Sequence, residues 1–571
     1  MANKKAVLSK PLPNASLPRN AFDRESVREY HYALGQLCPV WWEPVIAGSH
    51  LKLNRKIFQR TSNLNTASFP IMDTHLQYYF VPYRQLWSLW DDFKLGIKDV
   101  NSSALIYNNT SGVNASIPNR VPYFDLADAM TVLNSYVGTP PAQQIYNQDA
   151  FYDGCKLLNM LGYGLPNTFA PTFAMEVNAW PILAYHKIYY DHFRNTTYET
   201  NENKLYNMDF LWAAAPNMKL GTTELNYGTI SKFLGLHYVN YRNDYFNNLY
   251  PSLNYISSSA LSGSNFAPGV NVSNPIGLPD SVVGASMYNG LMQDMGIEKL
   301  STGIRISQNI SQPSTYVNLT LQTIRSAFAL DKLIRSSAYA PQHHKEQYEA
   351  RFGIKFHNNP NESLFVGAFM NDIQIGEVTS TADTTNAGLG AIGGKGVSFA
   401  DWGKTLEFNA KEDGIIMAVQ YTTLRSNYRS LGIDSYLTKH LSEDYFQPEY
   451  QNLGLEPVYG SELNASLGQS TILGYRPRNQ RYKLGVDKSY GLFADMSEDL
   501  SHFINHTDVN RLPAVGQAGV NFAWFKLKPS DLDGITTSNW DGSWSTDQFY
   551  GQTVFGATII QNMSVHGQTS L

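Results

Sequence analysis

The amino-acid sequence predicts a mainly β fold, a β-sandwich that carries long helical and loop insertions. Two observations predict it. Apolar and β-branched runs typical of strands recur at 363–370, 404–408, 414–421 and 519–527. These runs lie far apart, and hairpins repeating about every ten residues are missing. The sheets must therefore close by pairing between distant segments, which is the pattern of a sandwich with insertions between its strands.

The composition indicates a neutral, aromatic-rich surface. Of the 571 residues, 16% are charged and 13% are aromatic, with 36 tyrosines. Tyr and Trp are enriched, and Lys and Glu depleted, where proteins meet each other. We therefore expect much of the outside of this chain to lie against other chains. The hydrophobic content of 43% supports a sizeable core and excludes a wholly disordered chain.

Charge and cysteine content exclude several classes of protein. A net charge of −5 excludes a globally basic nucleic-acid-binding protein. Two cysteines, Cys38 and Cys155, exclude a disulfide scaffold and a cysteine-based zinc module. We expect two buried thiols, with one isolated disulfide as the alternative. The sequence has no apolar run long enough for a transmembrane helix and no apolar segment in residues 1–10. We expect a protein without membrane insertion that is assembled inside a cell.

Residues 1–35 are expected to form a basic arm. Its cations are Lys4, Lys5, Lys10, Arg19, Arg24 and Arg28. Prolines at 11, 13 and 18 disfavour both helix and sheet. A solvated flexible tail explains the same composition equally well.

Residues 36–250 are predicted to form the first part of the sandwich, with helical insertions. A β-type run at 76–81 is ended by Pro82, and apolar residues then recur at helical spacing over 86–93. A further helix is expected at 181–194, with its proline in the first turn. The expected structural core includes Tyr79, Phe80, Trp87, Trp90, Phe193 and Phe328.

Residues 251–316 form a Ser-, Gly- and Pro-rich insertion with few charged residues. The segment is long for a structureless loop, and its apolar residues give it material to pack, so we expect an ordered excursion. Residues 317–571 are predicted to hold helices near 321–334 and 341–352, the remaining strands and a C-terminal extension.

No catalytic residue, metal site or cofactor is expected. The G-x-G-x-x-G match at 388–393 lacks the preceding strand and following helix that a dinucleotide site needs, which favours a glycine-rich loop. His186 and His192 belong to the densest His/Asp cluster, but a six-residue separation aligns them poorly on a helix. They are more typical of structural histidines than of catalytic ones.

The sharpest basic cluster lies at 475–483. It contains Arg476, Arg478, Arg481 and Lys483, interleaved with tyrosines. This combination suits single-stranded nucleic acid, because cations meet phosphates and tyrosine stacks on bases. An exposed loop or a carboxylate partner on another subunit explains the cluster as well.

Ordered blocks of residues resemble a known family. They are Gln36-Leu-Cys-Pro-Val, Asn54-Arg, the stretch 70–87 beginning Pro-Ile-Met-Asp-Thr-His, and the blocks 184–195, 241–246, 319–328, 474–478 and 525–533. Together they resemble the major capsid protein of microviruses, small single-stranded DNA bacteriophages, with the gokushovirus branch closest. His192 stands where relatives often carry Trp, and Leu-Gln-Thr-Ile at 321–324 replaces Ile-Asn-Asp-Leu, which indicates a divergent lineage.

The resemblance implies a single eight-stranded antiparallel jelly roll with long insertions. About sixty copies would close a T=1 icosahedral shell around a circular single-stranded DNA genome, together with minor virion proteins. It places the protein in the virion, after assembly in the bacterial host cytoplasm.

The resemblance also implies roles for two of the segments. The insertion 251–316 would build a protrusion at each three-fold axis and contact a host cell-surface receptor. Its candidate contact residues are Phe266, Val283, Met287, Tyr288 and Met292. DNA would face the basic arm, through Lys4, Lys5 and Lys10, and the cluster at 475–483.

Two other functional classes remain. A Tyr-rich surface binding module, such as an adhesin or receptor-binding protein, would share the aromatic surface. A glycan-active β-sandwich enzyme would also use Trp and Tyr, but it needs paired carboxylates in a cleft. A megadalton particle would distinguish the capsid from both.

Overall fold

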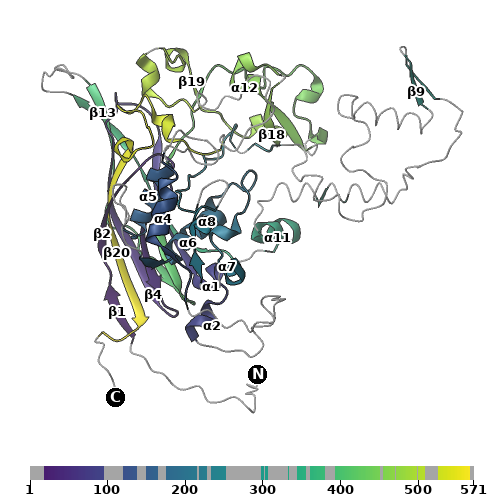
Figure 1. The fold of residues 1–571 in the computed structure, drawn as a ribbon. Helices are drawn as coiled ribbons and strands as arrows, with labels where there is room; N and C mark the ends of the chain where they lie inside the picture. Colours follow the sequence, from purple (N-terminus) through teal and green to yellow (C-terminus); the bar gives the residue numbers. More distant parts are fainter. Residues whose placement is uncertain are drawn as a thin grey trace, which may run out of the picture. The chain divides into compact units, whose positions relative to one another are not determined.

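Two antiparallel sheets form the main body of the larger of two compact units (Figure 1). The first unit is Met1–Leu249 with His357–Leu571, and the second is Tyr250–Phe356. In this computed structural model, the residues that the structure describes are 19–95, 120–137, 150–164, 175–214, 218–227, 233–247, 249–251, 297–300, 303–306, 329, 332–333, 344–354, 361–379, 392–450, 454–469, 471–497, 499–507 and 525–565.

The larger sheet has seven strands and joins segments from both ends of the chain. Its strands are β1 (Arg19–Asp23), β2 (Ser26–Tyr32), β4 (His50–Thr61), β12 (Gln374–Thr379), β13 (Ile392–Ala400), β14 (Leu406–Asn409) and β20 (Phe549–Asn562). The order is β1-β20-β4-β13-β12, with β2 also on β20 and β14 also on β4. β20 pairs with β4 along most of its length, so distant segments close the sheet. The predicted mainly β fold with non-local pairing is confirmed.

The smaller sheet has four strands in the order β11-β5-β15-β3. They are β3 (Cys38–Val45), β5 (Met72–Pro82), β11 (Leu364–Asp372) and β15 (Gly414–Leu424). Every residue of β15 is buried, because this strand is paired on both edges and covered on both faces. Such a strand carries a continuous apolar run instead of an alternating pattern.

Aromatic and polar side chains fill the space between the two sheets. Trp41 of β3 stacks on Phe555 of β20, with ring centroids 5.6 Å apart. The Tyr32 hydroxyl lies 2.7 Å from the Thr422 hydroxyl and accepts a hydrogen bond from Gln59. Buried polar groups are stable when they find such partners, so this layer joins the sheets without exposing either to water.

Part of the segment that the sequence predicts to be an N-terminal arm belongs to the larger sheet. Residues 19–32 form β1 and β2, where the sequence analysis expects an arm through residue 35. Both strands pair with β20, which lies more than 500 residues later in the sequence. The prolines that disfavour sheet all precede Arg19, so they do not interrupt these strands.

The helices of the first unit that lie between β5 and β11 cover one side of the sandwich (Figure 1). They are α1 (Tyr83–Leu86), α2 (Trp90–Leu95), α4 (Leu126–Asn134), α5 (Ala150–Met160), α6 (Trp180–Ile188), α7 (Asp209–Ala214) and α8 (Thr222–Leu225). α6 has proline near its start, as predicted, and continues as a π-helix over Tyr189–Phe193. No helix in the described residues is long and apolar enough to cross a membrane.

The helix expected over 86–93 is interrupted. α1 ends at Leu86, Trp87 has an extended backbone, and α2 starts at Trp90. The break lets Trp87 bury its indole completely, beside Trp180 of α6. Tertiary packing here overrides the helical spacing of the sequence.

Smaller elements complete both units. The first unit adds the sheet β7-β6-β8 (Glu176–Asn178, Tyr123–Asp125, Lys219–Leu220), the pairs β16–β19 (Tyr428–Arg429, Lys488–Ser489) and β17–β18 (Leu455–Tyr459, Ile472–Pro477), and α12 (Gly460–Leu463). The second unit contains the hairpin β9–β10 (Ile297–Leu300, Gly303–Ile306) and α11 (His344–Phe352). Of the strand expected at 519–527, only 525–527 are described, and they form an isolated bridge and not a strand.

Candidate functional site

The basic cluster on β18 and the turn after it is neutralised in part by carboxylates. Arg476 is buried, and its Nε donates to Glu456 Oε1 at 3.0 Å. Its Nη2 lies 3.3 Å from Glu462 Oε2, and the guanidinium lies 3.9 Å above the Tyr245 ring. Two carboxylates thus balance the buried charge of Arg476 within this chain, which leaves it less available to a phosphate, and its DNA-facing role stays a prediction.

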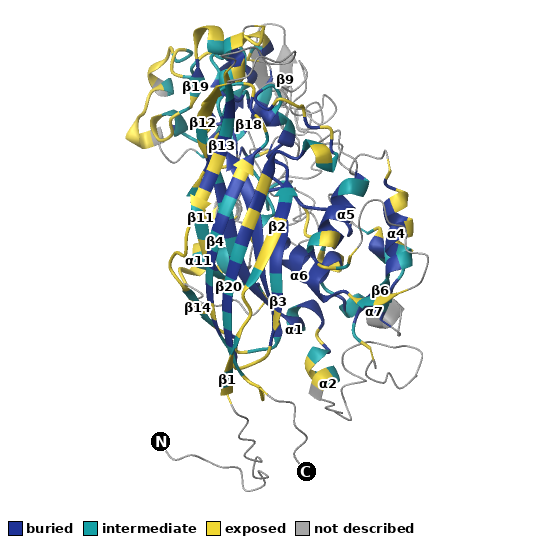
Figure 2. Cartoon of the chain, turned by 90° about the vertical axis from the view of Figure 1, so that its left-hand side faces the viewer, coloured by how far each residue is buried: buried dark blue, intermediate teal, exposed yellow. Residues whose placement is uncertain are grey.

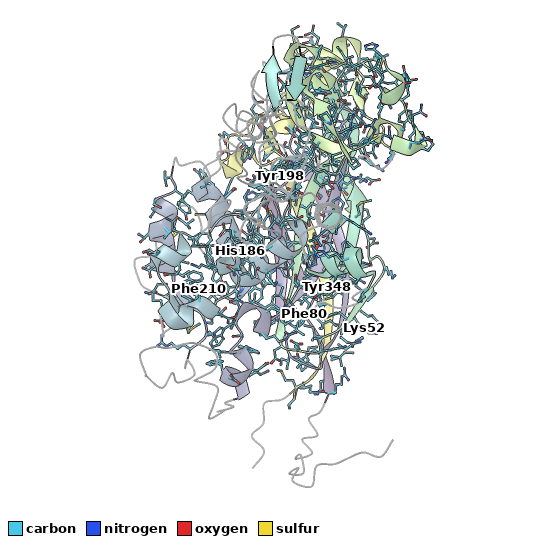
Figure 3. The ribbon with its side chains drawn as sticks, turned by 90° about the vertical axis from the view of Figure 1, so that its right-hand side faces the viewer. Lys52, Phe80, His186, Tyr198, Phe210 and Tyr348 are labelled. Carbon is cyan, nitrogen blue, oxygen red and sulfur yellow. The ribbon has the colours of Figure 1, made fainter. Side chains whose placement is uncertain are left out.

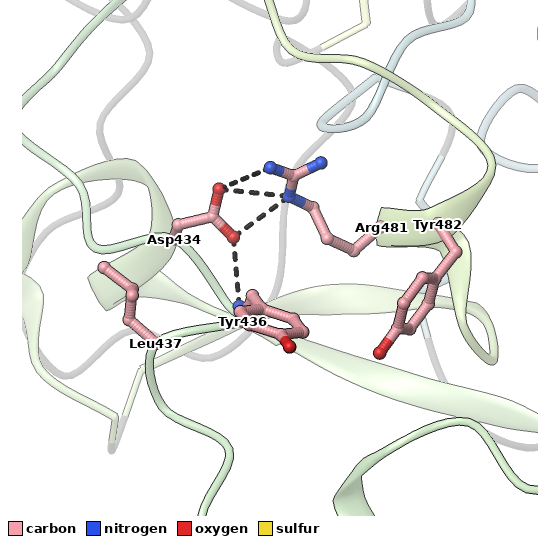
Figure 4. A pocket seen from close by; sticks show the side chains of 5 residues that line it. All are labelled: Asp434, Tyr436, Leu437, Arg481 and Tyr482. Atoms are coloured by element: carbon pink, nitrogen blue, oxygen red, sulfur yellow. Dashed lines mark hydrogen bonds and ion pairs between the residues drawn. The ribbon is translucent and has the colours of Figure 1, made fainter.

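Arg481 is paired in the same way but nearer the surface. Its Nε and Nη2 bind the Asp434 carboxylate at 3.0 and 2.8 Å (Figure 4). This hydrogen bonding lowers the pKa of Asp434 below its ordinary value. Asp434 lies more than 40 residues away in the sequence, so the residues around Arg481 could not predict this ion pair. Lys483 donates to the carbonyl of Arg478 at 3.4 Å, and a DNA-facing role for these two residues stays a prediction.

Several predicted site residues lie outside the described residues. They are Lys4, Lys5 and Lys10 of the arm, Phe266, Val283, Met287, Tyr288 and Met292 of the insertion, and Phe328 of the core. The other expected core residues lie inside the first unit. Tyr79, Phe80 and Trp87 are buried, whereas Trp90 and Phe193 are partly exposed and pack against the core.

The histidine cluster has a structural arrangement. His186 lies in the helical layer, whereas Phe80 belongs to β5 of the four-stranded sheet (Figure 3). Its Nδ1 is 2.8 Å from His237 Nε2, and its Nε2 is 2.7 Å from the Phe233 carbonyl oxygen. Burial lowers the pKa of His186 to about 4, so the ring is neutral near pH 7. His192 instead contacts Ser363, and the two histidines do not share a site.

A buried ion pair connects the helical layer to the C-terminal part of the chain. Lys526 Nζ lies 2.6 Å from Glu199 Oε1, with side chains 3% and 0% exposed. The Tyr189 hydroxyl donates to Glu199 Oε2 at 2.5 Å, and its ring stacks on His237 with centroids 3.6 Å apart. Burial lowers the pKa of Lys526. These contacts join Glu199, Tyr189, His237 and Lys526 into one buried cluster.

A second buried cation, Lys156, joins a helix to the C-terminal part of the chain. Lys156 of α5 lies 2.7 Å from Asp547 Oδ2, with side chains 4% and 1% exposed. It also donates to Gln36 at 3.0 Å. Asp547 lies two residues before the start of β20, so this pair ties α5 to the seven-stranded sheet.

No cluster of His, Cys, Asp and Glu suited to a metal ion occurs among the described residues. Both cysteines are buried.

Exposed apolar side chains gather in the segment between β15 and the C-terminal strand. Figure 2 shows many exposed residues in the short elements around β19. The set is Leu431, Ile433, Tyr436, Leu437, Leu441, Tyr445, Phe446, Tyr482, Leu484, Tyr490, Leu492 and Met496. Soluble monomers rarely expose so many large apolar side chains in one segment, so this surface has the character of a protein contact.

Comparison with known proteins gives a consistent result along almost the whole chain. The model of a family described as "Capsid protein (F protein)" matches residues 11–130 and 142–571. "Capsid protein VP1" of Chlamydia phage 1 is 22% identical over 530 residues, covering 84% of this chain and 85% of the relative. "Capsid protein VP1" of Bdellovibrio phage phiMH2K is 22% identical over 551 residues, covering 91% and 88%.

Proposed function

Because this chain belongs to the capsid protein (F protein) family, we propose that about sixty copies of it assemble into a T=1 icosahedral shell. The protein is a structural component of a virion and not an enzyme. The observation that carries the proposal is the family match, which spans both sheets and the helical layer that covers one side of them. A glycan-active enzyme is set aside on the same ground.

We propose that the core of the fold is an eight-stranded jelly roll. The strand orders support it. Four strands of the larger sheet run β2-β20-β4-β13, and the smaller sheet runs β3-β15-β5-β11. In each set, the two strands that come latest in the sequence, β13 and β20 or β11 and β15, alternate with the two that come earliest. This alternation is the pattern of two interlocked Greek keys. β1, β12 and β14 are additions at the edges or corners of this core.

Contacts between copies would use the exposed apolar side chains between residues 431 and 496. Their Tyr, Leu, Phe and Met content is that of the buried centre of a permanent interface. Covering them would also explain why only 16% of the residues are charged. Each copy in a closed shell meets several others, so the contact area is divided among them.

The insertion 251–316 is proposed to be an outward protrusion that contacts a receptor on the host cell. The division of the chain supports it, because residues 250–356 form a compact unit separate from the one that holds the sheets. The shell would enclose a circular single-stranded DNA genome, with minor virion proteins, after assembly in the host cytoplasm. Residues 1–18, which contain Lys4, Lys5 and Lys10, would reach that DNA.

Expression of the full chain in bacteria tests the assembly proposal. Sixty copies of a 64.0 kDa chain give a particle of about 3.8 MDa, which sedimentation velocity distinguishes from a monomer. Particles recovered with the genome should protect single-stranded DNA from added nuclease. A stable monomer at concentrations at which related shells form would refute the proposal.

A further inference from the structure

The outward face of the seven-stranded sheet carries a row of cations on β4. Buried and accessible residues alternate along this strand (Figure 2). The accessible ones include Lys52, Lys56 and Arg60. Side chains four residues apart on a strand share a face, so the three cations lie on one side of the sheet. Lys52, labelled in Figure 3, lies on the side away from the helices.

Carboxylates pair with the first two cations of the row, and none of the described carboxylates pairs with the third. Lys52 lies 3.4 Å from Glu407, and Lys56 lies 3.5 Å from Asp401. Arg60 has no carboxylate within ion-pair distance among the described residues, and its guanidinium lies 4.8 Å above the Phe58 ring. The unbalanced positive charge of this row is therefore concentrated at the Arg60 end.

A pocket of about 450 Å³ opens at that end. Arg60, Lys395 of β13 and Tyr550 of β20 line it. Arg60 is directly opposite both Tyr550 and Val397, and Lys395 is two residues from Val397, so all three side chains belong to the same face. The remaining lining consists of hydroxyl and amide side chains, including Asn63, Thr537 and Ser538, and no described Asp or Glu is among the lining residues.

This lining matches a phosphate with a flat ring beside it. Two cations and several neutral hydrogen-bond donors suit the oxygens of a phosphodiester, and charged donors make the strongest such bonds. Tyr550 is 45% exposed and presents a ring on which an unstacked base can stack. A base inside a duplex has no free face, so the ring favours a single strand. An acidic peptide would fill the cationic part but would gain nothing from the tyrosine.

We propose that the pocket of Arg60, Lys395 and Tyr550 binds a phosphate and its adjoining base in a single-stranded nucleic acid. This rests on the proposed function, in which the shell encloses a single-stranded DNA genome. It adds a specific contact point on the folded sheet, separate from the basic arm and from the cluster at 475–483. The sheet face that carries the pocket is then the one turned toward the genome.

Binding of a fluorescein-labelled oligothymidylate, about twenty nucleotides long, to the purified full chain tests the pocket by fluorescence anisotropy. The double variant Arg60→Gln/Lys395→Gln should bind about tenfold or more weakly, and its slope of log K against log salt should be shallower by about 1.4, for two lost phosphate contacts. The matched control is Lys52→Gln/Lys56→Gln, which removes the same charge from the same sheet face. It should bind as the unchanged protein does, and equal losses in both variants would overturn the proposal.

The aromatic contribution is tested on Tyr550. Tyr550→Leu should weaken oligothymidylate binding about fivefold or more, whereas Tyr550→Phe keeps the ring and should not. Without any substitution, the unchanged protein should bind oligothymidylate about fivefold more tightly than an abasic strand of the same length and charge. Equal affinity for the two strands would show that no base is recognised and would refute the proposal.

Competition measurements distinguish the possible ligands of the pocket. Thymidine monophosphate should compete far less well than the oligonucleotide, and equal potency would indicate a mononucleotide site in place of a strand. An acidic peptide that displaces the oligonucleotide at equal concentration would likewise overturn the proposal. Electron microscopy of the same preparations distinguishes failure of the pocket proposal from failure of the proposed capsid function. Shells that form normally while the pocket variants bind like the control refute only the pocket, whereas absence of shells refutes the proposed function.

Discussion

Replacing Lys526, whose side chain is buried, by methionine should destabilise the subunit strongly. Its Nζ lies 2.6 Å from Glu199 Oε1 and also donates to the Tyr238 carbonyl at 3.0 Å. Met fills similar volume but leaves the Glu199 carboxylate, 0% exposed, without its cation. Breaking a buried pair from one side costs about 3–5 kcal/mol, because a charge remains in a medium that solvates it poorly.

Two comparison variants isolate the buried charge as the cause. Lys526→Met/Glu199→Gln removes both charges and should recover most of the loss, because replacing a whole buried pair is nearly neutral. Glu176→Gln breaks the surface pair with Arg120, whose side chains are 52% and 53% exposed, and should cost less than about 1 kcal/mol.

Guanidinium unfolding of the unassembled subunit measures these differences. Tryptophan fluorescence and circular dichroism should give the same midpoints, which checks that a single free energy of unfolding applies to each variant. The reasoning is refuted if Lys526→Met shifts the midpoint no more than Glu176→Gln. It is also refuted if the double variant is as unstable as the single one.

Three more predictions follow from burial and chain organisation. Trp87→Ala should cost about 3–5 kcal/mol, and Trp90→Ala roughly half as much, because only Trp87 is completely buried; equal costs in guanidinium unfolding would contradict this. Stability should fall as the pH drops from 6.5 toward about 4, because the unfolded chain binds a proton at His186 at a higher pH than the folded chain does; the free energy of unfolding should decrease by up to about 3 kcal/mol. His186→Gln should flatten the dependence of the unfolding midpoint on pH, and an unchanged dependence would exclude this cause. Deleting 251–316 should leave shells that close but change adsorption to host cells; a chain that no longer folds would show that the segment belongs to the core.

The sequence predicted the fold where local pattern and final packing agree. The continuous apolar run of β15 and the proline at the start of α6 each identify an element that the structure contains. The resemblance to microvirus capsid proteins is confirmed at the family level. Composition alone indicated assembly, and only the ordered blocks indicated which kind of assembly.

The parts that could not be predicted depend on partners far away in the sequence. β1 and β2 exist because β20 pairs with them, and nothing within residues 19–32 reveals that partner. The ion pairs of Arg476 could not be predicted because Glu456 and Glu462 reach it only after β17 and β18 pair. The candidate nucleic-acid pocket was missed for the converse reason: its cations and its tyrosine come from three strands and form no local motif.

A cryo-EM reconstruction of the assembled particle tests the central claim most directly. We predict a T=1 shell of about sixty copies in which the eight strands form one jelly roll. Neighbouring copies should cover the apolar side chains between 431 and 496, and the face of β4, β13 and β20 that carries Arg60, Lys395 and Tyr550 should line the interior of the shell. A shell with those apolar side chains exposed and that sheet face turned to the outside, or no closed shell at all, would contradict it.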